Sequence, residues 1–215
     1  MALHPYLLEL ASLMAIFSFA IVSPGADLAM VMRQSIVAGR RAAILTSFGI
    51  GASLMMHVTY TILGLGLVIS QSIALFNIVK WCGVAYLVYI GLKALGAKKA
   101  EAPEVDDAAP RPQQAQSALR AFGLGFAANA LNPKPVFFFL SIFSTVVSAA
   151  TPIPVKFGYG LVMASCLILW FVGVSLFMTR PAMRARFTRI SHWIDRAGGL
   201  VFITLGLKLA TEKAG

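Results

Sequence analysis

The chain has 215 residues, of which 59% are apolar and only 12% are charged. Soluble globular domains carry about 25% charged residues. This composition therefore excludes an ordinary soluble domain and indicates a protein of the lipid bilayer. The formal net charge is +10, and the positions of the basic residues decide whether that charge suggests a nucleic-acid partner.

A helix that crosses a bilayer core of about 30 Å needs about 20 apolar residues. Six stretches reach or approach this length, in chain order residues 5–32, 42–70, 76–95, 121–150, 157–178 and 200–210. The first and fourth stretches are interrupted by proline, and the sixth is short. We therefore predict an all-α integral membrane protein with six transmembrane segments.

The first segment lacks the features of a cleaved signal peptide. The first basic residue is Arg33, so no basic region precedes the apolar run, and no small-residue cleavage pattern follows it. We expect this helix to remain in the mature protein.

The basic residues alternate between loops along the chain. Thirteen of the 18 follow the first, third or fifth segment: Arg33, Arg40, Arg41, Lys93, Lys98, Lys99, Arg111, Arg120, Arg180, Arg184, Arg186, Arg189 and Arg196. By the positive-inside rule these loops are cytoplasmic, and both the N-terminus and the C-terminus face outward. The charge reflects membrane topology and predicts no nucleic-acid partner.

Residues 96–120, "GAKKAEAPEVDDAAPRPQQAQSALR", are rich in Ala, Pro, Gln and charge and lack apolar periodicity. They are typical of a flexible linker. The linker divides the chain into a first three-helix repeat, residues 1–95, and a second, residues 121–215.

The two halves resemble each other weakly. Pro24 and Pro133 are 109 residues apart, and "FGIG" at residues 48–51 recurs at the same spacing as "FGYG" at residues 157–160. Because each half has three spans, the second enters the membrane from the opposite side, which makes an inverted 3+3 repeat. Secondary transporters recurrently have this plan, with a substrate site near the midplane. The alternative is accidental similarity between glycine-rich membrane helices.

The proline motifs "SPGAD", residues 23–27, and "NPKP", residues 132–135, lie inside segments too long for one straight crossing: both would exceed about 40 Å at 1.5 Å per residue. We predict that segments one and four break there. Ser23 and Asn132 are favoured N-cap residues, and proline suits the first helical position. Each motif then begins a half-helix whose unpaired N–H groups carry partial positive charge.

Lys134 and Asp27 are charged residues deep in apolar segments, where an unpaired charge costs about 2.5–3.5 kcal/mol. We expect Lys134 and the two helix starts to bind a carboxylate, and Asp27 to bind an ammonium group. The alternative is a salt bridge between them that only joins the halves. The predicted substrate-binding residues are Ser23, Pro24, Gly25, Asp27, Asn132, Pro133 and Lys134.

His57 lies near the middle of the second segment. It is a candidate for proton coupling together with Asp27, or else a histidine hydrogen-bonded to a neighbouring helix. Asn129, Tyr60 and Tyr86 suit either a polar cavity or interhelical hydrogen bonds.

The glycines of the repeated "FGxG" motif, Gly49, Gly51, Gly158 and Gly160, favour close helix packing, because a glycine lets neighbouring backbones approach.

Together, "SPGAD", the following "RQSIVAGRRAAILTSFGIGASLMMH" and "NPKPVFFF" resemble the LysE/RhtB family of amino-acid exporters. The resemblance covers the chain apart from the linker. It implies efflux of amino acids or close derivatives across the bacterial inner membrane, driven by the proton motive force. Pro24, Gly25 and Asp27 match its first motif, and Asn132, Pro133 and Lys134 its second. Ala26 departs from the pattern, in which a second proline is common.

The resulting hypothesis is a proton-coupled amino-acid antiporter that is not an enzyme and needs no metal or cofactor. One rival is an inorganic cation exporter, which would favour several converging carboxylates or thiols. Another is a thiol-disulfide electron conduit using Cys82 and Cys166, although these cysteines lie far from the prolines in sequence. A third is a membrane scaffold without transport. No motif encodes the oligomeric state or the side-chain specificity. The apolar surroundings and the single deep acidic residue favour neutral over dibasic amino acids.

Overall fold

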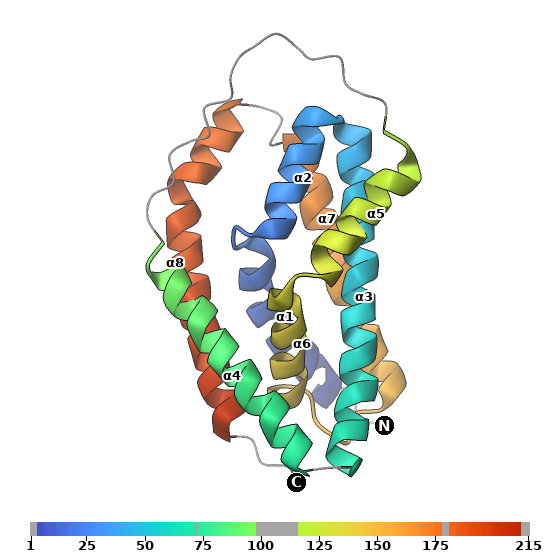
Figure 1. Cartoon of the computed structure of the whole chain (residues 1–215), viewed down its shortest axis with the longest axis vertical. Helices are drawn as coiled ribbons and strands as arrows, with labels where there is room; N and C mark the ends of the chain where they lie inside the picture. Colours follow the sequence, from blue (N-terminus) through green and yellow to red (C-terminus); the bar gives the residue numbers. More distant parts are fainter. Residues whose placement is uncertain (1–3, 72, 98–115, 178–180, 212–215) are drawn as a thin grey trace.

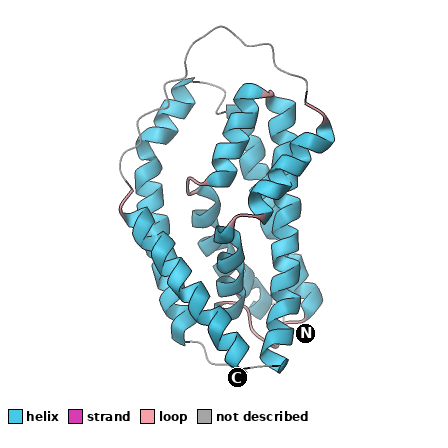
Figure 2. Ribbon diagram, in the orientation of Figure 1, coloured by secondary structure: helices cyan, strands magenta, loops and turns pink. Residues whose placement is uncertain are grey.

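The computed structural model describes residues 4–71, 73–97, 116–177 and 181–211, and every regular element in these ranges is a helix (Figures 1 and 2). The helices are α1 (His4–Val22), α2 (Ala26–Val37), α3 (Arg40–Gln71), α4 (Ile73–Leu95), α5 (Ala118–Ala130), α6 (Pro133–Thr145), α7 (Ile153–Phe177) and α8 (Pro181–Thr211). Most of the predicted linker, residues 96–120, lies outside the described residues; its last three residues form the start of α5.

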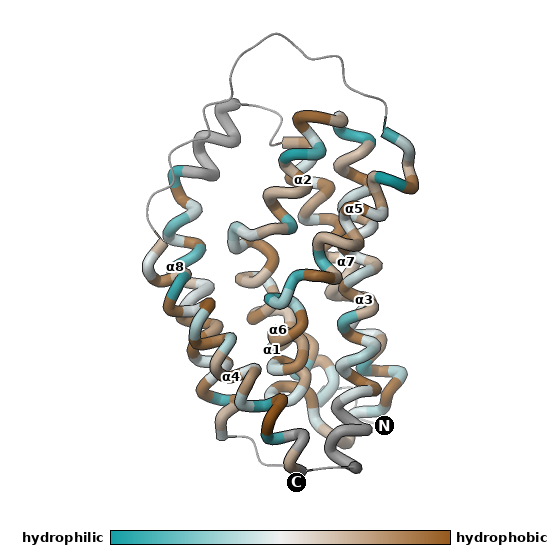
Figure 3. The backbone as a smooth tube through the Cα atoms, in the orientation of Figure 1, coloured by the Kyte–Doolittle hydropathy of each residue, from teal (hydrophilic) through white to brown (hydrophobic). Residues whose placement is uncertain are grey.

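Four of the described helices are long and apolar enough to cross a bilayer: His4–Val22, Arg40–Gly64, Asn77–Leu95 and Ile153–Phe177. Apolar residues predominate along much of the bundle in Figure 3. The predicted class, an all-helical protein with several apolar helices, is confirmed.

Two of the predicted segments each contain two helices. The first comprises α1 and α2, with non-helical residues 23–25 between them, and the fourth comprises α5 and α6, separated by residues 131–132. In both segments the two helices meet toward the middle of the bundle (Figure 1).

The long helix α3 packs most extensively against α5 and α7, while α4 packs along α8. Figure 1 shows α4 and α8 side by side at one edge of the molecule, with α1, α2 and α6 between them and α3. The core between these helices contains fully buried residues from several of them, including Leu13, Ile50, Leu87, Ile142 and Met163.

Two glycines set the crossing of α3 and α5. A Cβ at Gly49 would lie 2.0 Å from the Phe122 carbonyl oxygen, and one at Gly125 would lie 2.1 Å from that of Thr46. The Thr46 hydroxyl also donates to the carbonyl oxygen of Ala121 at 3.0 Å. The backbones therefore touch here, which only glycine permits.

The predicted packing role of the "FGxG" glycines is confirmed at three of four positions. Besides Gly49, a Cβ at Gly51 would meet Ile168 at 2.5 Å, and one at Gly160 would meet Val58 at 2.7 Å. The prediction is wrong for Gly158, where a Cβ would meet nothing within 4 Å. The motif repeats in sequence, but its first glycine in the second half faces no neighbouring helix.

We predict that Gly125→Ala destabilises the protein by about 1–3 kcal/mol, the usual cost of overpacking, because the backbone of α3 must retreat. Gly123→Ala, on the same helix, is the matched control, because a Cβ there meets nothing within 4 Å. Thermal unfolding in detergent measures both variants. Equal unfolding midpoints for the two variants would contradict the close crossing.

Candidate functional site

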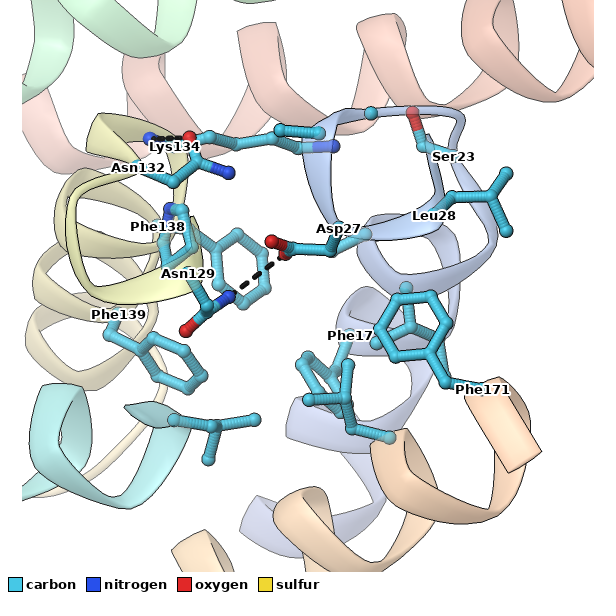
Figure 4. A pocket seen from close by; sticks show the side chains of 17 residues that line it. Phe17, Ser23, Asp27, Leu28, Asn129, Asn132, Lys134, Phe138, Phe139 and Phe171 are labelled. Atoms are coloured by element: carbon cyan, nitrogen blue, oxygen red, sulfur yellow. Dashed lines mark hydrogen bonds between the residues drawn. The ribbon is translucent and has the colours of Figure 1, made fainter. Parts of the chain in front are cut away.

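A cavity of about 50 Å³ lies where α2 and α6 begin, between the two interrupted segments (Figure 4). Its polar lining consists of Ser23, Asp27, Asn129, Asn132 and Lys134. Apolar side chains complete the wall, among them Phe17, Phe138, Phe139 and Phe171. The cavity therefore joins a few polar groups to a mainly apolar enclosure, as small-molecule sites do.

The start of α6 forms as the sequence predicts. Asn132 is the N-cap residue, and its side-chain oxygen accepts a hydrogen bond from the Lys134 backbone N–H at 3.0 Å. Pro133 occupies the first turn, where the absence of an N–H group costs nothing. The remaining N–H groups of this turn give the cavity wall partial positive charge.

The start of α2 differs from the prediction. Its N-cap is Gly25, in an extended conformation and without a side-chain cap, so neither Ser23 nor Pro24 occupies the predicted position. The Ser23 hydroxyl instead donates to Asp195 Oδ1 on α8 at 3.0 Å. A tertiary hydrogen bond has thus replaced the local cap, and the helix begins two residues after the proline.

Asp27 lies in the first turn of α2 and points across the cavity (Figure 4). Its Oδ2 accepts a hydrogen bond from Asn129 Nδ2 at 2.9 Å. Asp27 Oδ1 and Asn129 Oδ1 are buried and accept no hydrogen bond from any described residue. Two neighbouring buried acceptors without a donor suit an ammonium group, which supplies three N–H donors.

The Lys134 side chain extends from α6 toward the loop of residues 23–25 (Figure 4). Its ammonium group lies 5.1 Å from the ring centroid of Phe202 and interacts electrostatically with Asp27 and Asp195. Both carboxylates belong to described residues, and neither has an oxygen within 4.0 Å of the Lys134 nitrogen, the limit for an ion pair. The simple Lys134–Asp27 salt bridge, the structural alternative drawn from the sequence, is therefore not formed.

Asp195 is the residue that the sequence interpretation missed. It lies outside the predicted apolar segments, before residues 200–210, whereas α8 carries it to Ser23 and within electrostatic range of Lys134. No local pattern around Asp195 signals this position, because the packing of α8 against α1 decides it. The site thus contains two carboxylates and one ammonium group.

His57 lies behind Asn129, and its side chain is fully buried. Its Nε2 lies 3.2 Å from the Asn129 main-chain oxygen, which only accepts, so Nε2 carries the proton. Nδ1 then accepts a hydrogen bond from the Tyr60 hydroxyl. The ring of Phe139 stacks against the imidazole at an interplanar angle of 10°. His57 contacts the cavity through Asn129 and does not line it.

The structure brings together most of the predicted site residues. Ser23, Gly25, Asp27, Asn132 and Lys134 line one cavity although more than 100 residues separate the two groups. Pro24 and Pro133 adjoin it in sequence without lining it. The sequence suits Asn129 either to a polar cavity or to an interhelical hydrogen bond. In the structure it lines the cavity and donates from α5 to Asp27 on α2.

The described residues also bear on the two alternative hypotheses, an inorganic cation exporter and a thiol-disulfide electron conduit. No group of three or more His, Cys, Asp or Glu side chains there is placed to hold a metal ion. Cys82 is exposed on α4 and Cys166 is half-buried on α7, and neither lines the cavity.

The apolar helices and the charged cavity between them define a helical membrane protein with a polar site among its helices. The model of the LysE type translocator family matches residues 18–213, and the chain belongs to this family. It is a multi-pass integral membrane protein.

Similar proteins share most of their length with this chain. The threonine efflux protein of Escherichia coli (strain K12) is 30% identical, with 90% of this chain and 93% of the relative aligned. The homoserine/homoserine lactone efflux protein of Salmonella typhimurium is 29% identical over 89% of this chain and 91% of its own length. The membrane protein YahN of Escherichia coli is 29% identical over 92% and 86%. No solved structure matches the chain.

We predict that Asn132→Ala destabilises the protein by about 1 kcal/mol, the typical cost of losing an N-cap. Asn132→Asp is the matched variant, because its carboxylate can still accept the Lys134 backbone N–H. Thermal unfolding in detergent compares them, and a loss of stability in Asn132→Asp equal to that in Asn132→Ala would argue against the cap.

Proposed function

We propose that this protein exports small neutral amino acids or close derivatives across the bacterial inner membrane by proton antiport. The observation that carries the proposal is the pairing of two buried acceptors, Asp27 Oδ1 and Asn129 Oδ1, with the Lys134 ammonium group across one cavity. An amino-acid zwitterion has the complementary pair of charges. The efflux activities named for the similar proteins point the same way.

In the proposed topology six segments form an inverted 3+3 repeat, with both termini outside. The first segment consists of α1 and α2, and the fourth of α5 and α6, broken at their proline motifs. The opposed half-helix starts, at Gly25 and Asn132, meet at the cavity. Rocking of the repeats against each other gives alternating access to it.

Binding follows from the charges around the cavity. The substrate carboxylate meets Lys134 and the partial positive charge of the α6 start. Its ammonium group meets Asp27 and the side-chain oxygen of Asn129. The substrate side chain then lies against phenylalanine rings, and the cavity of about 50 Å³ favours a small side chain.

Coupling depends on the charge of Asp27. A proton taken up from the outside neutralises the carboxylate, weakens its hold on the ammonium group and promotes release outward. Loss of that proton to the cytoplasm restores the ammonium site for the next substrate. His57, which two hydrogen bonds link to Asp27 through Asn129, is the second group proposed to take part.

Inside-out membrane vesicles test the proposal directly. Labelled threonine, homoserine, lysine and leucine are offered to vesicles with and without an acidic interior. Accumulation of threonine or homoserine that depends on the pH gradient supports proton-coupled export. Uptake of none of them above vesicles without the protein would refute it.

We predict that Asp27→Asn abolishes gradient-driven accumulation, because an amide neither holds the ammonium group by charge nor exchanges a proton. Glu9→Gln is the control, since Glu9 is hydrogen-bonded to Thr151 and Tyr159, away from the cavity. The same vesicle assay measures both, with membrane-inserted protein quantified. Normal accumulation by Asp27→Asn would exclude Asp27 as the coupling residue.

We predict that Lys134→Gln raises the KM for threonine about 30-fold or more, which corresponds to the loss of about 2 kcal/mol from a buried charge contact. Threoninol, which lacks the carboxylate, should lose little affinity in the variant. Competition of each compound with labelled threonine measures this difference. An equal loss for threonine and threoninol would show that Lys134 does not bind the carboxylate.

A further inference from the structure

A second cavity, of about 210 Å³, lies between α3, α4, α6 and α8. It shares no lining residue with the first cavity. Tyr60, Thr61 and Lys80 border it together with apolar residues such as Val79 and Leu209. The function proposed above makes no use of this cavity.

Tyr60 connects the second cavity to the substrate site. Its hydroxyl donates to His57 Nδ1, and 37% of its side chain is exposed. His57 Nε2 donates in turn to the main-chain oxygen of Asn129, whose side chain donates to Asp27. Four residues on three helices therefore form one hydrogen-bonded chain from the second cavity to the Asp27 carboxylate.

The second cavity has room for water, although apolar groups form nearly all of its lining. A water molecule occupies about 30 Å³ of liquid and needs at least two polar partners. Tyr60, Thr61, Ser144 and Lys80 provide such groups at the border. Thr61 Oγ1 is buried and makes no hydrogen bond with any described residue, so the Tyr60 hydroxyl is the group on which the route depends.

We propose that protons reach the coupling site through this second cavity and Tyr60, by a route separate from that of the substrate. The inference rests on the proposed antiport. A proton from cavity water passes to the Tyr60 oxygen while the Tyr60 hydroxyl proton passes to His57 Nδ1. The imidazole then carries protons on both nitrogens and one positive charge, and Tyr60 remains neutral.

The imidazolium ion explains why binding of the proton and binding of the substrate oppose each other. It lies behind Asn129, which binds Asp27, so its charge offsets that of the carboxylate as a proton on Asp27 would. The substrate ammonium group approaches the same carboxylate from the first cavity. Two cations near one carboxylate weaken each other's binding, and this coupling is reciprocal.

The groups around His57 are consistent with this role. Tyr60 faces it from α3, Asn129 from α5 and the ring of Phe139 from α6. Lys80 of α4 also borders the second cavity, and its ammonium group lies 5.3 Å from the Trp81 ring centroid.

The position of the second cavity agrees with the direction in which protons move during export. α3 begins next to Arg40 and Arg41, on the predicted cytoplasmic side, and Tyr60 lies one turn beyond His57 toward the opposite end. In the proposed topology the second cavity is therefore outward of His57, on the side from which protons enter during export.

The test uses the full chain in proteoliposomes and two measurements with labelled threonine. Accumulation driven by a pH gradient requires the proton route, whereas exchange of internal for external threonine without a gradient requires only the substrate route. Tyr60→Phe removes the hydroxyl. Gly64→Leu fills the second cavity, since a Cβ at Gly64 meets nothing within 4 Å. Gly64→Ala is the matched control.

We expect Tyr60→Phe and Gly64→Leu to lower the ratio of accumulation to exchange about fivefold or more, because coupling between linked sites begins at about this size. Gly64→Ala should leave the ratio unchanged. An unchanged ratio in both variants overturns the inference, whether exchange is kept or falls with accumulation. The proposed antiport fails separately, if wild-type protein shows no gradient-driven accumulation.

Discussion

The lack of hydrogen-bond partners for an open backbone inside lipid is the constraint on which this structure depends. Residues 23–25 and 131–132 are not helical, although the N–H groups of Ser23, Leu131 and Asn132 donate to preceding carbonyls. In hydrocarbon the remaining polar backbone groups at these helix ends would lack partners. Such segments are stable only where protein or a polar cavity surrounds them. The interruptions and the polar cavity are therefore one feature: each interrupted helix requires the cavity, and the cavity gains its partial charges from the helix starts.

Close helix packing holds this arrangement in place. α3 contacts α5 at Gly49 and Gly125 with direct backbone approach, and the same α3 presents His57 to Asn129 near the end of α5. The helix pair therefore sets the position of the Asn129 side chain, which in turn orients Asp27. An interface built for packing thus positions the residues proposed to bind substrate.

The charges of the site are separated and not paired. Lys134 interacts with Asp27 and Asp195 without a direct ion pair, and Asp27 and Asn129 keep buried acceptors free of protein donors. A closed salt bridge would compete with a zwitterion, whereas separated charges receive one at little cost. In the proposed route, the chain from Tyr60 through His57 to Asn129 brings the charge of the proton close to this carboxylate from the second cavity, so that substrate and proton need not share a path.

The sequence by itself determined the membrane class, the apolar helices, the family and most of the polar residues that line the cavity. Composition and length predict the class, because hydrocarbon imposes them directly. The charged and proline motifs predict Asp27, Asn132 and Lys134, because such residues are costly in apolar segments. Only the tertiary structure decided that Ser23 bonds Asp195 instead of capping α2, that Gly158 faces no neighbouring helix, and that Tyr60 joins His57 to a second cavity. These features depend on contacts between helices that no local pattern encodes, since the packing angle of α8 or α4 is set by side chains from both partners.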